Sequence, residues 1–96
     1  MLPRLDLSQC GRSIAENVDL VRRAEALGWE GAWVSEINGA DAVTSAACIA
    51  GALTSGRVGS AIFPMQTRDP LLLAMTAASL SGIAAGGFVL GLGTST

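Results

Sequence analysis

Few side chains in this sequence can carry chemistry. The 96-residue chain contains no His, no Lys and no Tyr, and its six basic residues are all Arg. These residues therefore provide no His-based catalytic triad, no lysine Schiff base and no P-loop lysine. Carboxylates, amides, hydroxyls, arginines and two cysteines remain, so function depends on where the fold places them.

One carboxylate and one amide lie where a parallel sheet would bind a ligand. Glu36 and Asn38 follow an apolar run, 31–35, that indicates a buried strand. In parallel α/β folds, ligands bind at the carboxyl ends of the strands. Glu36 could accept a hydrogen bond or a proton from a ligand, or it could cap the next helix or pair with Arg57 or Arg68. Asn38 could bind a ligand or form a turn.

Two other places at strand ends carry weaker signals. Arg68 could bind an anion at a pocket mouth, or pair with Asp69 or solvent. The closing run F-V-L-G-L-G-T-S-T (88–96) lacks the third glycine of a dinucleotide-binding turn and the lysine of a P-loop. Gly91 and Gly93 remove side chains there, which suggests a backbone that passes close to a flat ligand.

Helix caps mark the elements that must position these residues. Ser13 and Glu16 have the spacing of a capping box. Asp69-Pro70 combines an N-cap with proline at the first helical position, and Gly28 supplies a left-handed residue after a helix. The pattern predicts helices at 13–27, 42–53 and 70–83 and strands at 3–7, 31–35, 58–63 and 88–92.

The predicted order, β-α-β-α-β-α-β, indicates an α/β fold. Apolar strands without polar alternation indicate a sheet covered on both faces and hence parallel pairing, with right-handed crossovers. Two architectures fit: a small open α/β sheet, or part of a (β/α)8 barrel, which needs about 250 residues. Half a barrel by itself would leave bare edge strands and an exposed apolar face.

Composition excludes several classes of partner. The net charge of −2 and the lack of a basic stripe predict no nucleic-acid binding. Residues 70–96 carry no charge, but glycines at 86–87 interrupt them, so we predict no membrane span. Cys10 and Cys48 are isolated and no signal peptide precedes them, which predicts a cytoplasmic protein. Cys48 and Trp33 are expected in the core.

Five segments of the chain form a series with characteristic order and spacing. They are A-E-A-L-G-W-E-G-A-W-V-S-E (24–36), N-G-A-D-A (38–42), T-S-G-R-V-G-S-A-I-F-P (54–64), R-D-P-L-L-L-A (68–74) and F-V-L-G-L-G-T-S (88–95). The series resembles the N-terminal part of the bacterial-luciferase-like flavin- or F420-dependent oxidoreductases. It is most similar to the branch that uses the deazaflavin F420, which includes methylene-tetrahydromethanopterin reductases. The resemblance implies that residues 1–96 form a single partial domain, the first half of a TIM (β/α)8 barrel.

The resemblance also implies a reaction and a site. Members bind F420 or FMN at the carboxyl ends of the strands and transfer a hydride to or from a small-molecule substrate, or activate oxygen as FMN monooxygenases. No metal ligand is implied. Six site residues are carried over by motif position. Glu36, as the catalytic group, and Asn38 would lie at the coenzyme's polar edge. Ala61 and Ile62 would be joined by a non-prolyl cis peptide at the ring face, and Thr94 and Ser95 would lie near the ring or substrate.

Departures from the family pattern leave two hypotheses open. Gly86-Gly87-Phe88 stands where members usually have Gly-Arg-Phe, and the second half of the barrel, which supplies most phosphate contacts, lies outside these residues. The first hypothesis is a fragment or truncated member of an F420- or FMN-dependent oxidoreductase. The second is a non-catalytic half-barrel that self-associates as a homo-oligomer or pairs with another chain as a binding or assembly module.

Overall fold

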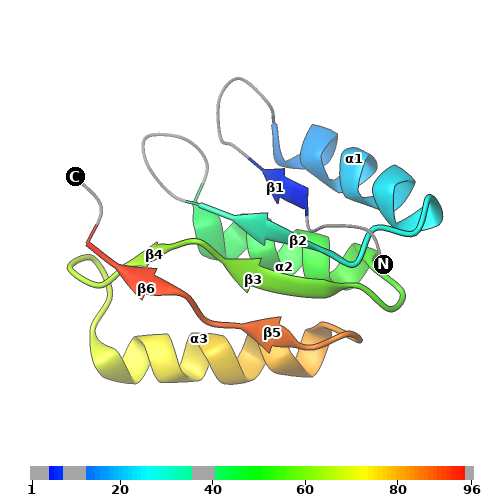
Figure 1. Cartoon of the computed structure of the whole chain (residues 1–96). Coiled ribbons are helices and arrows are strands. Elements are labelled where there is room, and N and C mark those ends of the chain that lie inside the picture. Colours follow the sequence, from blue (N-terminus) through cyan, green and yellow to red (C-terminus); the bar gives the residue numbers. More distant parts are fainter. Residues whose placement is uncertain (1–4, 8–12, 36–40, 95–96) are drawn as a thin grey trace.

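The computed structural model describes residues 5–7, 13–35 and 41–94 of the chain. Helices and strands follow one another along these residues, and Figure 1 shows the strands running side by side with helices packed against them. The elements are β1 (Leu5–Leu7), α1 (Ile14–Ala26), β2 (Gly31–Val34), α2 (Ala42–Ala52), β3 (Arg57–Ser60), β4 (Phe63–Pro64), α3 (Pro70–Ile83), β5 (Phe88–Val89) and β6 (Leu92–Gly93).

The helix termini form as their caps predict. Ser13 Oγ accepts the Glu16 N–H at 3.1 Å, and Glu16 Oε1 accepts the Ser13 N–H at 2.9 Å, which completes the capping box. Asp69 Oδ1 accepts the Leu72 N–H at 2.8 Å before the proline that opens α3. Gly28 has a φ of 96°, the left-handed conformation expected after a helix.

The main sheet is parallel and sequential. Its strand order is β1-β2-β3-β5, and all three pairings are parallel. A doubly wound sheet would reverse its order part-way, whereas here each new strand is added at the same edge. Because crossovers are right-handed, this order keeps all helices on one face.

Two of the predicted strands are split, so the simple alternation of strands and helices is not reproduced. The strand expected at 58–63 is divided into β3 and β4, and the strand expected at 88–92 into β5 and β6. β4 and β6 form a separate two-stranded parallel sheet. The break has a physical cause, because the Ser60 hydroxyl takes the place of a ladder partner by bonding to both the N–H and the C=O of Gly91, each at 2.8 Å.

One apolar cluster joins the helices to the sheet. It includes Val21 of α1, Ile49 of α2 and Leu80 of α3, all buried. Ala32 and Val58 meet them from β2 and β3. In a strand, successive side chains point to opposite faces. Trp33 and Gly59, which follow Ala32 and Val58 and pair with each other, therefore face away from the helices.

Two residues expected in the core are not buried there. Trp33 is half-buried on the face opposite the helices, and its ring lies over Gly59, where a side chain would overlap it. Cys48 is exposed, because it lies on the outer surface of α2, whose apolar sequence does not reveal which side is outward. Among the described residues, no helix is long and apolar enough to cross a membrane.

Candidate functional site at the carboxyl ends of the strands

The carboxyl end of β3 bends at Ala61 and Ile62. The peptide bond between these residues is cis, as the family resemblance implied for this position. The Ala61 N–H donates to the carbonyl of Val34, the last residue of β2, at 2.7 Å. Ala61 is exposed and Ile62 is half-buried. The bend therefore presents an accessible apolar surface at the end of the sheet where ligands bind in parallel α/β folds.

Gly91 fits against β3 through the buried Ser60. The Ser60 hydroxyl donates to the Gly91 carbonyl and accepts the Gly91 N–H. A Cβ on Gly91 would overlap the Ser60 carbonyl oxygen. A glycine is therefore needed here by the packing of the chain itself.

Gly93 has a neighbour that can move. A Cβ on Gly93 would lie 2.8 Å from Cδ1 of Ile62, which is the end of a flexible side chain. The packing of the chain therefore requires glycine at 91, whereas at 93 a small shift of Ile62 would make room for a side chain. Thr94 follows directly and is exposed, so its hydroxyl is available beside the bend.

The remaining implied site residues have no described position. Glu36, Asn38 and Ser95 lie outside the described residues, and their roles stay predictions. Of the six implied residues, the structure brings together Ala61 and Ile62, and packs Ile62 against the glycine that precedes Thr94.

Arg68 has a structural partner that the sequence did not indicate. Its guanidinium Nη2 lies 2.7 Å from Oδ1 of Asp41, and its side chain is only 11% exposed. The guanidinium carbon lies 5.4 Å from the centre of the Phe63 ring, within range of a cation–π interaction. Asp41 also accepts the Thr44 N–H at the start of α2. Arg68 thus connects the loop before α3 to the N-terminus of α2, and it pairs with Asp41, not with Asp69.

A carboxylate that the sequence did not single out is bound at the opposite end of the sheet. Glu25 accepts the backbone N–H groups of 54–56 and the hydroxyl of Thr54, at distances between 2.7 and 3.2 Å. Burial raises the pKa of Glu25, but these backbone and side-chain hydrogen bonds lower it more, so the pKa falls from 4.5 to about 2.

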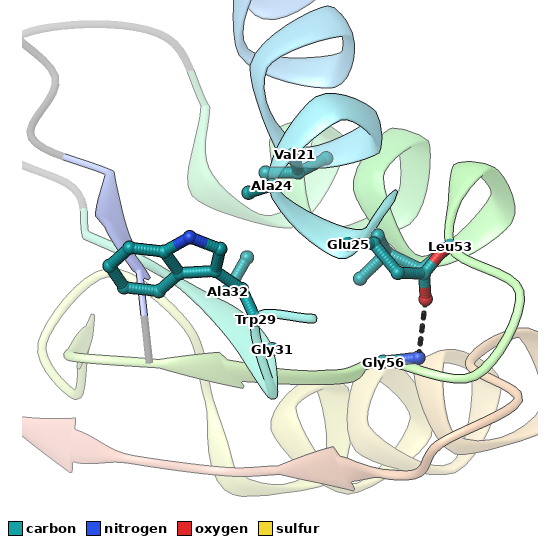
Figure 2. A pocket seen from close by; sticks show the side chains of 8 residues that line it. All are labelled: Val21, Ala24, Glu25, Trp29, Gly31, Ala32, Leu53 and Gly56. Carbon is teal, nitrogen blue, oxygen red and sulfur yellow. Dashed lines mark hydrogen bonds between the residues drawn. The ribbon is translucent and has the colours of Figure 1, made fainter. Parts of the chain in front are cut away.

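Figure 2 shows Glu25 at the amino ends of β2 and β3, beside a cavity of about 10 Å³. That volume holds about one water-sized probe, so this cavity is a gap in the packing and not a coenzyme site. The glutamate fixes the turn between α2 and β3. The only sequence signal was a T-S-G turn, 54–56, with three backbone N–H groups to satisfy.

The described part of the site can bind and orient, but it does not supply a proton-transfer group. Ala61 and Ile62 offer an apolar surface, and Thr94 offers a hydroxyl, whose proton is not acidic near neutral pH. Among the described residues, no group of three or more His, Cys, Asp or Glu side chains could hold a metal ion.

Comparison with known proteins finds the same family that the five segments of the sequence resemble. Residues 3–96 match the family described as luciferase-like monooxygenase. A Mycobacterium tuberculosis protein described as a coenzyme F420-dependent oxidoreductase is 32% identical over 92 residues, which is 95% of this chain and 26% of that protein. The solved coenzyme F420-dependent tetrahydromethanopterin reductase of Methanopyrus kandleri superposes with a TM-score of 0.84 at 26% identity, covering 97% of this chain and 27% of that one. The chain thus spans about a quarter of the length of these relatives.

Proposed function

Because the chain belongs to the luciferase-like monooxygenase family, we propose that it supplies the first half of a (β/α)8-barrel oxidoreductase that binds F420. The observation that carries the proposal is the accessible Ala61–Ile62 bend at the carboxyl end of a sequential parallel sheet. A barrel is built by adding each parallel strand at the same edge, with every helix outside. The superposition on an F420-dependent reductase supports this architecture.

The described residues fit one part of the coenzyme better than the other. A flat deazaflavin ring needs an apolar surface with few polar groups, and the exposed bend and the Thr94 hydroxyl provide these. The phosphate-bearing tail needs cationic or N–H donors. Arg68, which follows β4 at this end of the sheet, is already bound to Asp41. The groups that hold the tail are therefore proposed to come from outside this part of the chain.

Each residue then has a proposed role. Ile62 would support the ring through its contact with Gly93, and the Thr94 hydroxyl would donate to a polar atom at the ring or substrate. From the family resemblance, Glu36 would hold or accept a proton at its carboxylate, while Asn38 and Ser95 would orient the polar edge. When bound, the deazaflavin supplies or accepts the hydride. We favour F420 over FMN because both compared relatives are described as F420-dependent.

A fluorescence titration tests this proposal. The purified chain is titrated into F420 and, separately, into FMN, while circular dichroism confirms that it is folded. We expect a change in F420 fluorescence, and about a fivefold weaker affinity for Thr94→Val, the cost of one hydrogen bond of about 1 kcal/mol. Thr76→Val makes the same change on α3, away from the bend, and should bind as the unmodified chain does. If the folded chain changes the fluorescence of neither coenzyme, the proposed role is wrong.

The second hypothesis, a half-barrel that acts only in assembly, rests on an exposed apolar surface that the first hypothesis shares. Three large apolar residues in and between β5 and β6 are each more than a third exposed: Val89, Leu90 and Leu92. This surface needs a cover whether or not the chain binds a coenzyme. The predicted cytoplasmic location belongs to either hypothesis and remains a proposal.

A further inference from the structure

Trp33 lies low over the face of the main sheet that is opposite the described helices. Its neighbours in β2, Ala32 and Val34, are buried in the core, whereas Trp33 is half-buried on the other face. The six-membered part of its ring covers Gly59, where a Cβ would overlap the ring atoms Cζ3 and Cε3. Strand side chains usually stand away from their sheet, but this indole leans across the next strand, and only glycine allows it to do so.

The indole lies next to the exposed bend at the end of β3. Gly59 and Ala61 share one face, because Val58 and Ser60, which alternate with them, are both buried. The Ala61 N–H still donates to the last residue of β2, so the two strands remain side by side at this point. Two residues of strand span about 7 Å, a distance that an aromatic side chain can reach. Ala61 is therefore within reach of the indole.

The surface around the indole is apolar on both sides of Gly59. Val89 of β5 pairs with Gly59 from the side opposite Trp33, and Val89 is 39% exposed. These three residues form a row across β2, β3 and β5, and none of the three side chains carries a charge. A flat heteroaromatic ring gains from such a surface in two ways, by burying apolar area and by contact with the indole.

From these observations we propose that Trp33 is a coenzyme-binding residue, whose indole forms the surface on which the deazaflavin ring rests beside Ala61. This role depends on the proposed function and adds to it the aromatic residue of the site. Ala61 and Ile62 offer the ring only aliphatic contacts, whereas an indole adds an aromatic contact. Trp33 has no proton to exchange near neutral pH, so it binds and orients the ring and takes no part in proton transfer.

A role in packing alone fits the geometry of Trp33 less well. The interior of a (β/α)8 barrel is filled by bulky side chains that several strands contribute to the same layer. Here β3 contributes a glycine, and Trp33 lies low over it. The pair therefore forms a low surface beside Ala61, which itself is exposed. Such a surface suits a flat ligand that approaches from the carboxyl ends of the strands.

Hydroxyl-radical footprinting, read by mass spectrometry, tests this role in the unmodified chain. Trp29 is the internal control, because it is the other tryptophan of the sequence and is also half-buried. It lies beside Glu25 at the amino ends of the strands (Figure 2). Saturating F420 should reduce the oxidation of Trp33 and leave that of Trp29 unchanged.

A matched pair of substitutions provides a second measurement. Trp33→Leu should bind F420 about two- to tenfold more weakly in the fluorescence titration, the cost of one aromatic contact. Trp29→Leu makes the same change at the opposite end of the sheet and should bind as the unmodified chain does. If Trp33→Leu is unfolded by circular dichroism, the footprint of the unmodified chain decides by itself.

The outcomes separate this role from the proposed function. If F420 binds but Trp33 is oxidised as in the free chain, Trp33 does not contact the ring, and the role is refuted while the proposed function stands. Equal protection of both tryptophans also refutes it, because a ring beside Ala61 does not cover Trp29. If the folded chain binds no F420, the proposed function is wrong, and the role of Trp33 is wrong with it.

Discussion

Replacing Glu25 with Gln should destabilise the chain at neutral pH and have little effect at low pH. The carboxylate binds the turn 54–56 through backbone N–H groups, and the closest, from Gly56, lies at 2.7 Å. Gln keeps the shape and one acceptor oxygen, but it has no charge and presents an amide N–H to a backbone donor. The ionised carboxylate is therefore the part of the interaction that is lost.

The size of the effect follows from the pKa. A tenfold change in the acid constant is worth about 1.4 kcal/mol, so a fall from 4.5 to about 2 sets a ceiling of about 3 kcal/mol. Glu25 is only half-buried, and solvent screening reduces this to about 1–2 kcal/mol. Because the folded pKa is depressed, the stabilisation is complete above pH 4.5 and is lost as the pH falls towards 2.

Urea denaturation followed by circular dichroism measures this difference. The free energy of unfolding of Glu25→Gln should lie about 1–2 kcal/mol below that of the unmodified chain at pH 7 and approach it near pH 2, where the protonated carboxyl resembles the amide. Asp19→Asn removes one negative charge from the same helix and breaks an exposed pair with Arg23, 3.0 Å away. This control substitution should lower the free energy of unfolding by no more than about 0.5 kcal/mol. Equal stability of Glu25→Gln and the unmodified chain at pH 7, or a deficit that persists at pH 2, would refute the reasoning.

Further substitutions test the packing around the split strands and the exposure of α2. Gly91→Ala should lower the free energy of unfolding by about 2 kcal/mol, since its Cβ overlaps the Ser60 carbonyl. At Gly82 on α3 an added Cβ would meet nothing within 4 Å, so Gly82→Ala should raise the free energy of unfolding by about 0.5–1 kcal/mol. Urea titration compares the stabilities of these two variants. Ser60→Ala loses both bonds to Gly91 and should cost about 1–3 kcal/mol in the same assay. Cys48 should react fully with a thiol reagent in the native chain, measured in a Cys10→Ser background, and slow reaction would contradict its exposure.

The sequence predicted those features that depend on residues close together in the chain. The capping box of Ser13 and Glu16 and the Asp69-Pro70 start of α3 each involve residues at most three apart. The strand break did not follow from the sequence, because Ser60 and Gly91 are 31 residues apart. A hydroxyl within an apolar strand gives no sign that it will bond to the backbone of a neighbouring strand.

The two misplaced core residues have a related explanation. Trp33 belongs to a strand that is apolar throughout, so no alternation shows which side chains face the helices. Cys48 belongs to a helix of mainly small apolar residues, where no polar stripe marks the outer side. In both cases the sequence indicated an apolar element, and only the packing of α2 and the sheet decided the direction of each side chain.

The candidate site was predicted through motif resemblance and could not have been built from residue chemistry alone. Ala61 and Ile62 carry no reactive group, so no search for catalytic side chains would select them. The glycines at 91 and 93 suggested a ligand in the sequence, yet the Ser60 carbonyl by itself requires the glycine at 91. The evidence for a ligand at this end therefore comes from the position of the bend and from the family.

The two ends of the sheet have different physical tasks, and this separates the expected effects of mutation. At the amino end, Glu25 binds the turn 54–56 and its ionisation stabilises the fold. At the carboxyl end, Ser60 and Ile62 pack against glycines and leave Ala61 and Thr94 exposed. In barrels of parallel strands the carboxyl face carries function and the amino face carries stability. Substitution of Glu25 should therefore change the unfolding free energy without altering coenzyme affinity in the folded chain, whereas substitution of Thr94 should do the reverse.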